Sequence, residues 1–164
     1  KSYRPNSGKT FLHPGRQANI IYNGEVMGYL GEIHPQVADN YGIGDKTYVA
    51  VLDMPVVVKY ADFDRKFTGI ARFPAVTRDL SMVVPHEILA GDIEDMIVQR
   101  GGKILESYQL FDVYEGSQIK AGYKSMAYSV VFRAKDKTLE ESEINTAMKK
   151  ILNGLSSMGI ELRQ

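Results

Sequence analysis

The stretch 110–139 decides the fold of the second half of the chain. It begins LFDVYEG at 110–116, crosses a polar link that holds Gly116 and Gly122, and returns as KSMAYSVVFRAKDKTL at 124–139. The returning part alternates large apolar residues with small or polar ones, and its apolar set is Met126, Tyr128, Val130 and Phe132. Because successive side chains of a strand point to opposite faces of a sheet, this pattern predicts a hairpin with one buried and one open face. We look for function on the open face.

The outgoing strand of the hairpin should follow the same rule. Its end places the apolar Phe111 and Val113 on the buried face, and Asp112 and Tyr114 on the open face. The alternation slips near Tyr108–Leu110, which predicts a β-bulge at that point.

The signals around the hairpin predict an α+β fold. From residue 79 onward we expect, in order, a strand at 79–84, a helix from Gly91 or Asp92 to Gly101, and strands at 104–114 and 125–133. A second helix should follow, opened by a Thr138–Glu141 capping box and ended by Gly159. The last element should be a strand at 160–163 with Ile160 and Leu162 inward. This order is that of the ferredoxin-like βαββαβ fold. Each helix has one apolar stripe, so both should cover the same face of a four-stranded antiparallel sheet. The side chains expected in the shared core include Met82, Ile97, Phe111, Val113, Val130, Phe132, Ile151 and Leu155.

The sequence of residues 1–70 predicts a smaller, mostly antiparallel β segment with short helices. The expected features are a turn at Pro14-Gly15, strands at 18–22 and 26–33 joined by a tight Asn23-Gly24 turn, a helix from Pro35 to about Tyr41, a strand at 46–52, and a helical turn capped by Asp53. This segment is too small to close a good core alone, so we expect it to expose apolar surface. We place one domain at 1–70 and another at 71–164. The opening KSYRPNSGKT suggests the middle of a larger protein.

The amino-acid composition limits the classes of function that the chain can have. The chain has 20 basic and 20 acidic residues, so a nucleic-acid role would depend on local cations, stacking and shape rather than on long-range attraction. It has no cysteine, which excludes disulfides and thiolate metal sites and fits a reducing compartment. No apolar run approaches the length of a membrane span, and no signal-peptide pattern opens the chain.

We find no catalytic or metal-binding pattern. Gly8-Lys9-Thr10 resembles the end of a phosphate-binding loop, but the full pattern requires glycine where the chain has Tyr3. The histidines, His13, His34 and His86, lack metal-ligand spacing, and the two that precede proline suit turn and cap roles. We therefore expect no catalytic residue, cofactor site or metal site in these residues.

The expected open face carries one set of side chains of interest: Tyr114 with Asp112, Ser125 and Arg163. Two interpretations fit Tyr114. It is either an aromatic residue that packs at the rim of the sheet or a stacking platform for an unpaired base, with donors and acceptors beside it. Spacing alone leaves both open.

The chain resembles the beta subunit of bacterial phenylalanyl-tRNA synthetases. Residues 73–164 are similar to its C-terminal ferredoxin-fold anticodon-binding domain, through FPAVTRDLSMVV, LFDVYEG, KSMAYSVVFRAKDKTL and GIELR. Residues 11–35, FLHPGRQANIIYNGEVMGYLGEIHP, resemble the hairpin that ends the preceding domain, a degenerate relative of the synthetase catalytic fold. The paired presence of HPGR and FPAVTRD favours the beta subunit over the single-chain organellar enzyme. The resemblance thus implies a C-terminal fragment of that subunit.

The resemblance also implies roles for residues. The family's anticodon contacts fall on Tyr114 for stacking, Asp112 and Ser125 for base edges, Arg163 near base or phosphate, and Ser81. The family usually has alanine or another small residue where Ser81 stands, so a side-chain role there is not implied.

The activity that the resemblance implies is binding of the tRNA(Phe) anticodon, in support of ATP-dependent aminoacylation by the alpha subunit. It implies ATP and magnesium for the whole enzyme only, a heterotetramer with the alpha subunit, a cytoplasmic location, and no membrane or DNA partner. The alternative is a ferredoxin-like module that binds a small metabolite or a protein through its open sheet face. A third interpretation is an assembly surface, with residues 1–70 packed on other parts of the enzyme.

Overall fold

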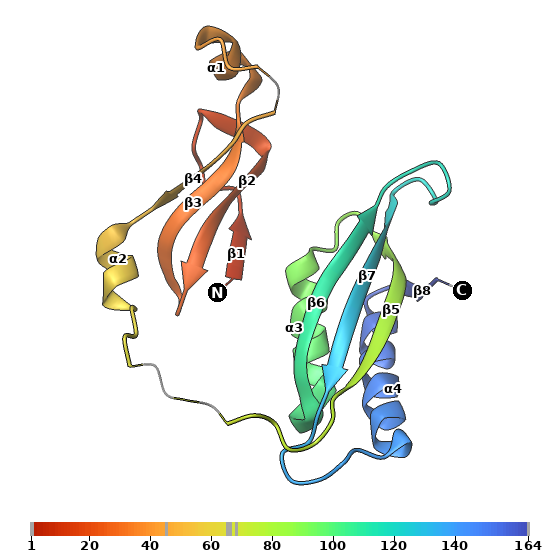
Figure 1. The fold of residues 1–164 in the computed structure, drawn as a ribbon. Coiled ribbons are helices and arrows are strands. Elements are labelled where there is room, and N and C mark those ends of the chain that lie inside the picture. Colours follow the sequence, from red (N-terminus) through yellow and green to blue (C-terminus); the bar gives the residue numbers. More distant parts are fainter. Residues whose placement is uncertain (1, 45, 65–66, 68, 164) are drawn as a thin grey trace. The chain divides into compact units, whose positions relative to one another are not determined.

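The computed structural model of the chain describes residues 2–44, 46–64, 67 and 69–163. The chain forms two compact units, Lys1–Phe67 and Thr68–Gln164. Each unit has its own four-stranded antiparallel sheet (Figure 1). The predicted α+β class is therefore confirmed.

The second unit has the predicted βαββαβ order. Its elements are β5 (Val76–Pro85), α3 (Ala90–Gly101), a short 3-10 turn (Gly102–Ile104), β6 (Leu105–Tyr114), β7 (Tyr123–Phe132), α4 (Glu141–Ser157) and β8 (Glu161–Leu162). The strand order is β6-β7-β5-β8, and every neighbouring pair is antiparallel. Strand β7 is thus central, and β6 and β8 are the edges.

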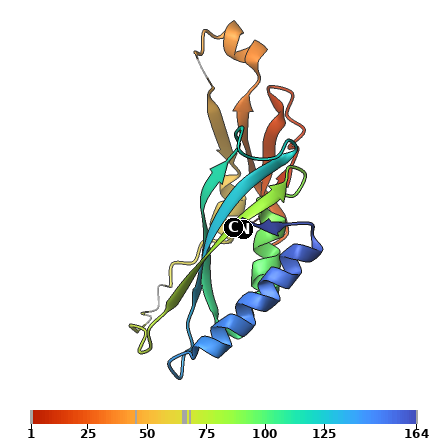
Figure 2. The same ribbon diagram turned by 90° about the vertical axis from the view of Figure 1, so that its right-hand side faces the viewer.

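Both helices of this unit cover one face of the sheet, as predicted (Figure 2). Met126 and Tyr128 on β7 are buried against them, so the predicted register of the hairpin is confirmed. The side chains that fill the space between sheet and helices include Leu80, Met82, Val84, Ile93, Ile97, Val130, Phe132, Ile144, Ile151 and Leu155. Among the described residues of this unit, no helix packs on the other face of the sheet.

Strand β6 differs from the prediction near its end. The pairing with β7 shifts between Leu110 and Asp112, so Phe111 is the extra residue of a bulge just beyond the predicted position. Phe111 is 55% exposed and Val113 is 50% exposed, so the expectation that both are buried was wrong. The bulge takes Phe111 out of the alternation, and Val113 lies on an edge strand with a neighbour on one side only.

The helix starts and the last strand also correct the prediction in detail. Helix α4 is capped at Glu140 rather than Thr138, because the Glu143 carboxylate accepts a hydrogen bond from the Glu140 N–H at 3.1 Å. Helix α3 begins at Ala90, with the Asp92 carboxylate accepting from the Leu89 N–H at 3.2 Å. Leu162 was expected inward but is 51% exposed, because β8 is a two-residue edge strand.

The first unit contains one more strand than the sequence predicted. Its elements are β1 (Ser2–Pro5), β2 (Leu12–Tyr22), β3 (Glu25–Ile33), α1 (Pro35–Asn40), β4 (Tyr48–Leu52) and α2 (Met54–Lys59), with strand order β1-β2-β3-β4. Asn23 and Gly24 form the expected turn, with φ values of 48° and 82°. The turn expected at Pro14-Gly15 is instead an irregular part of β2, within a pairing shift between Leu12 and Gln17.

The core of the first unit is small. Its buried apolar side chains, among the residues described, are Leu12, Ile20, Ile21 and Ala38. The apolar side chains that are more than half exposed include Tyr41, Tyr48, Met54, Val58, Phe63 and Phe67. The exposed apolar surface expected for this segment is therefore present.

Candidate nucleic-acid interface

The uncovered face of the second sheet brings the predicted site residues into two adjacent rows. Tyr114 on β6 lies directly opposite Ser125 on β7. Asp112 and Ser81 lie on either side of Ala127 in the next row. All of them are on the face opposite to the buried Met126 and Tyr128, because neighbours along a strand alternate between faces.

Arg163 reaches this face from the other edge of the sheet. Its backbone N–H donates to the Ser81 carbonyl at 2.9 Å, which continues the pairing of β8 with β5. Its side chain crosses β5 and places Nη1 3.5 Å from the Ser125 hydroxyl oxygen on β7. The structure thus brings the cation of Arg163 to the row that holds Tyr114.

Tyr114 and Ser125 differ in accessibility although they are neighbours in one row. Tyr114 is 40% exposed, so part of its side chain is accessible to a stacking partner. Ser125 is only 5% exposed, since it lies on the central strand between Tyr114 and Val83 and beneath Arg163. A ligand can reach the Tyr114 ring directly, but it reaches the Ser125 hydroxyl only where Arg163 moves aside.

Asp112 and Ser81 offer free polar groups at the same face. Both residues are exposed. In the part of the chain that the structure describes, neither side chain forms a hydrogen bond or ion pair. A free carboxylate acceptor, an open aromatic ring and a cation side by side are the groups that hold unpaired bases.

Sequence reasoning missed two residues at the end of this face. Tyr123 lies opposite Pro85 and shares the open face with Ser125 by register. The Lys120 ammonium lies 4.9 Å from the centre of the Tyr123 ring, which adds a local cation. The period-two pattern of β7, continued by one step, would have placed Tyr123 here.

The patterns set aside in the sequence have structural roles. The Lys9 N–H donates to the Gln17 side chain at 3.1 Å, so it is not directed at a phosphate. Nδ1 of His13 accepts from the Gly15 N–H at 3.1 Å within the irregular part of β2, and Nδ1 of His34 accepts from the Gln36 N–H at 3.3 Å as the N-cap of α1. Among the described residues, no group of three or more histidine, aspartate or glutamate side chains is placed to hold a metal. In the same part of the chain, no helix is long and apolar enough to cross a membrane.

The sequence has many relatives among characterised proteins. It is 46% identical over 163 residues to the phenylalanine–tRNA ligase beta subunit of Clostridium tetani. This alignment covers 99% of this chain and 21% of that protein. It is 39% identical over 163 residues to the subunit of the same name from Clostridium acetobutylicum, and 38% identical over 144 residues to that of Bacillus subtilis. The chain spans about a fifth of the length of these relatives.

Two family descriptions match the two parts of the chain. Residues 2–54 match the phenylalanyl tRNA synthetase beta chain CLM domain. Residues 71–163 match the ferredoxin-fold anticodon binding domain, which has the fold observed in the second unit. This second match covers more than half of the residues of the chain, so the chain belongs to the family of the ferredoxin-fold anticodon binding domain.

Proposed function

We propose that the open sheet face of the second unit binds the anticodon of tRNA(Phe). The observation that carries this proposal is the convergence of Tyr114, Asp112 and Arg163 on two neighbouring rows of an uncovered sheet, around the small residues Ser81 and Ser125. In this proposal the Tyr114 ring stacks on one base, Asp112 bonds a base edge, and Arg163 lies beside a base or phosphate. The family membership supports the same ligand class.

The relatives support a proposal about the larger protein. We propose that residues 1–70 are part of a degenerate catalytic-like domain and that 71–164 form the anticodon-binding domain of a phenylalanine–tRNA ligase beta subunit. In that cytoplasmic enzyme the alpha subunit would carry out aminoacylation with ATP and magnesium, and the two kinds of subunit would form a heterotetramer. The residues of this chain would contribute binding rather than catalysis.

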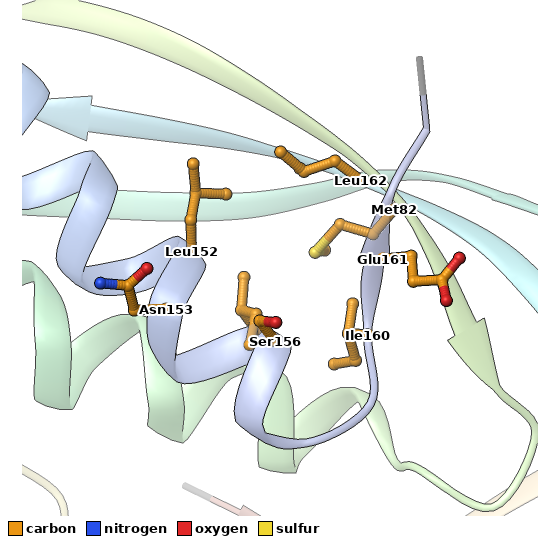
Figure 3. A pocket seen from close by; sticks show the side chains of 8 residues that line it. Met82, Leu152, Asn153, Ser156, Ile160, Glu161 and Leu162 are labelled. Carbon is orange, nitrogen blue, oxygen red and sulfur yellow. The ribbon is translucent and has the colours of Figure 1, made fainter.

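The alternative function, binding of a small metabolite, is less well supported than RNA binding by the cavity at the end of α4. A cavity of about 310 Å³ lies between the end of α4 and β8 (Figure 3). It is lined by Met82, Leu152, Asn153, Leu155, Ser156, Ile160, Glu161 and Leu162. Its lining includes Met82, Leu155 and Ile160, which belong to the core between sheet and helices. None of the five proposed contact residues lines it.

A titration with RNA tests the proposal. The whole chain should bind an anticodon stem-loop of tRNA(Phe) more tightly than a stem-loop with an unrelated anticodon. Stacking of one base on an aromatic ring contributes roughly 1–3 kcal/mol, so Tyr114→Ala should weaken binding by about tenfold or more. Tyr114→Phe keeps the ring and should lose much less. Equal affinities of wild type and Tyr114→Ala, both shown to be folded, would contradict the proposal.

A further inference from the structure

The ring of Tyr114 lies against Gly116, two residues further along the chain. A β-carbon placed on Gly116 would be 2.5 Å from Cζ and 3.0 Å from Cε1 of this ring, and closer still to its hydroxyl oxygen. Favourable carbon–carbon contacts lie at about 3.5–4.0 Å. The ring in its present orientation therefore requires a residue without a β-carbon at this position.

The backbone does not explain this glycine. Gly122, at the other end of the same link between β6 and β7, has a φ of 83°, a conformation that favours glycine. Gly116 is not among the residues with positive φ, so its φ does not require glycine. Gly116 is also exposed, so a methyl group there meets no part of the core. The neighbour that excludes a side chain is the Tyr114 ring.

The orientation of this ring decides whether a base can stack on it. Tyr114 is the last residue of an edge strand, so no further strand on its outer side holds the ring. The ring lies against the link at Gly116. A binding group held in place before the ligand arrives loses less conformational entropy on binding.

We propose that Gly116 is a positioning residue for Tyr114: by leaving room for the ring, it sets the orientation of the surface on which a base stacks. The predicted effect of Gly116 on RNA affinity rests on the proposed function, whereas its predicted effect on the orientation of the Tyr114 ring does not. It also gives a physical reason for glycine as the last residue of LFDVYEG.

The test compares Gly116→Ala with Gly91→Ala in the whole chain. Gly91 is an exposed glycine of α3, and a β-carbon placed on it meets no atom within 4 Å, so it is a matched control. In the protein without RNA, Gly116→Ala should shift the NMR resonances of the Tyr114 ring, and Gly91→Ala should leave them in place. Neither variant should unfold at a lower temperature than the wild type, because alanine at these positions lowers the conformational entropy of the unfolded chain.

The second measurement is the affinity for the anticodon stem-loop. Gly116→Ala should weaken binding by about fivefold or more, which is part of the stacking contribution. In the Tyr114→Ala background the same substitution should have no further effect, because there is no ring left to displace. Additive effects of the two substitutions would overturn the inference, since they would mean that Gly116 acts independently of Tyr114.

The remaining outcomes separate this inference from the proposed function. If wild type binds no stem-loop, the RNA proposal fails, and unchanged or shifted Tyr114 resonances still decide whether Gly116 positions the ring. If Gly116→Ala prevents folding, adding Tyr114→Ala should restore it, because the methyl group then meets no ring. Failure of this rescue, or unshifted resonances in a folded Gly116→Ala variant, would overturn the inference.

Discussion

At the scale of single residues, the site combines one open ring with one covered hydroxyl. Ser125 is the residue that joins them, since it lies opposite Tyr114 and its hydroxyl faces the Arg163 guanidinium. Because Ser125 is nearly inaccessible in the free protein, its hydroxyl is placed to hold Arg163. In the proposed site the partner of Arg163 is a base or a phosphate, and these two partners differ in how RNA binding should respond to salt.

Arg163→Ala should weaken binding of the anticodon stem-loop. If its partner is a phosphate, the variant should also lower the salt dependence of log K by roughly 0.7 per lost contact, the value for single strands. The measurement is a set of titrations at several salt concentrations. Tyr114→Phe serves as a control, since it changes no charge and should leave the slope unchanged. An unaltered slope in Arg163→Ala would assign Arg163 to a base rather than a phosphate.

At the scale of elements, β7 serves both the core and the site. It is the central strand of its sheet, with Tyr128, Val130 and Phe132 fully buried on one face and Ser125 on the other. Burial, with a smaller effect of Glu94, raises the pKa of the Tyr128 hydroxyl, which therefore stays protonated. This hydroxyl donates a hydrogen bond to the Ala90 carbonyl at 3.4 Å. Substitutions on the two faces of this sheet should therefore separate stability from binding.

Tyr128→Ala should destabilise the second unit by about 3–5 kcal/mol, the usual cost of removing a buried aromatic ring. The loss follows from the cavity between sheet and helices and from the contact with α3. Chemical denaturation followed by circular dichroism measures it. Tyr114→Ala is the matched control, because its ring lies on the open face and its removal should change the unfolding free energy little. A comparable loss in both variants would contradict the assignment of faces.

At the scale of the whole molecule, the two units differ in how much core they contain. The second unit encloses a continuous core, whereas the first leaves Tyr48, Met54 and Val58 exposed. The first unit is held in part by an ion pair: Nη1 of Arg16 donates to both carboxylate oxygens of Glu32, at 2.8 and 2.9 Å.

The stability of the first unit should fall in acid. Burial raises the pKa of Glu32, but the hydrogen bonds and charge of Arg16 outweigh this effect, so the net pKa is lowered. A lowered carboxyl pKa stabilises the fold above the ordinary carboxyl range, and this stabilisation is lost as the pH falls through the lowered value. Amide NMR signals of residues 2–54, followed between about pH 2 and 6, measure the loss. Glu32→Gln should flatten this pH dependence, and an unchanged profile would contradict the role of the pair.

The fold of the second unit could be predicted because its information is local. Alternation in β7 and the apolar stripes of the helices depend only on the geometry of strands and helices, which repeats every few residues. These patterns placed Met126 and Tyr128 inward and Tyr114 and Ser125 outward. The residue inserted by the bulge, Phe111, was misplaced because a bulge is set by the pairing of two strands and not by one strand alone.

The sequence by itself therefore determined the fold class, the faces of the strands and the residues on the open face. Only the tertiary structure decided how those residues meet. The cover over Ser125 comes from Arg163, 38 residues away, and the ring of Tyr114 lies against the link at Gly116. Such contacts depend on the reach of side chains across strands and on the path of a loop, and neither leaves a periodic trace in the sequence.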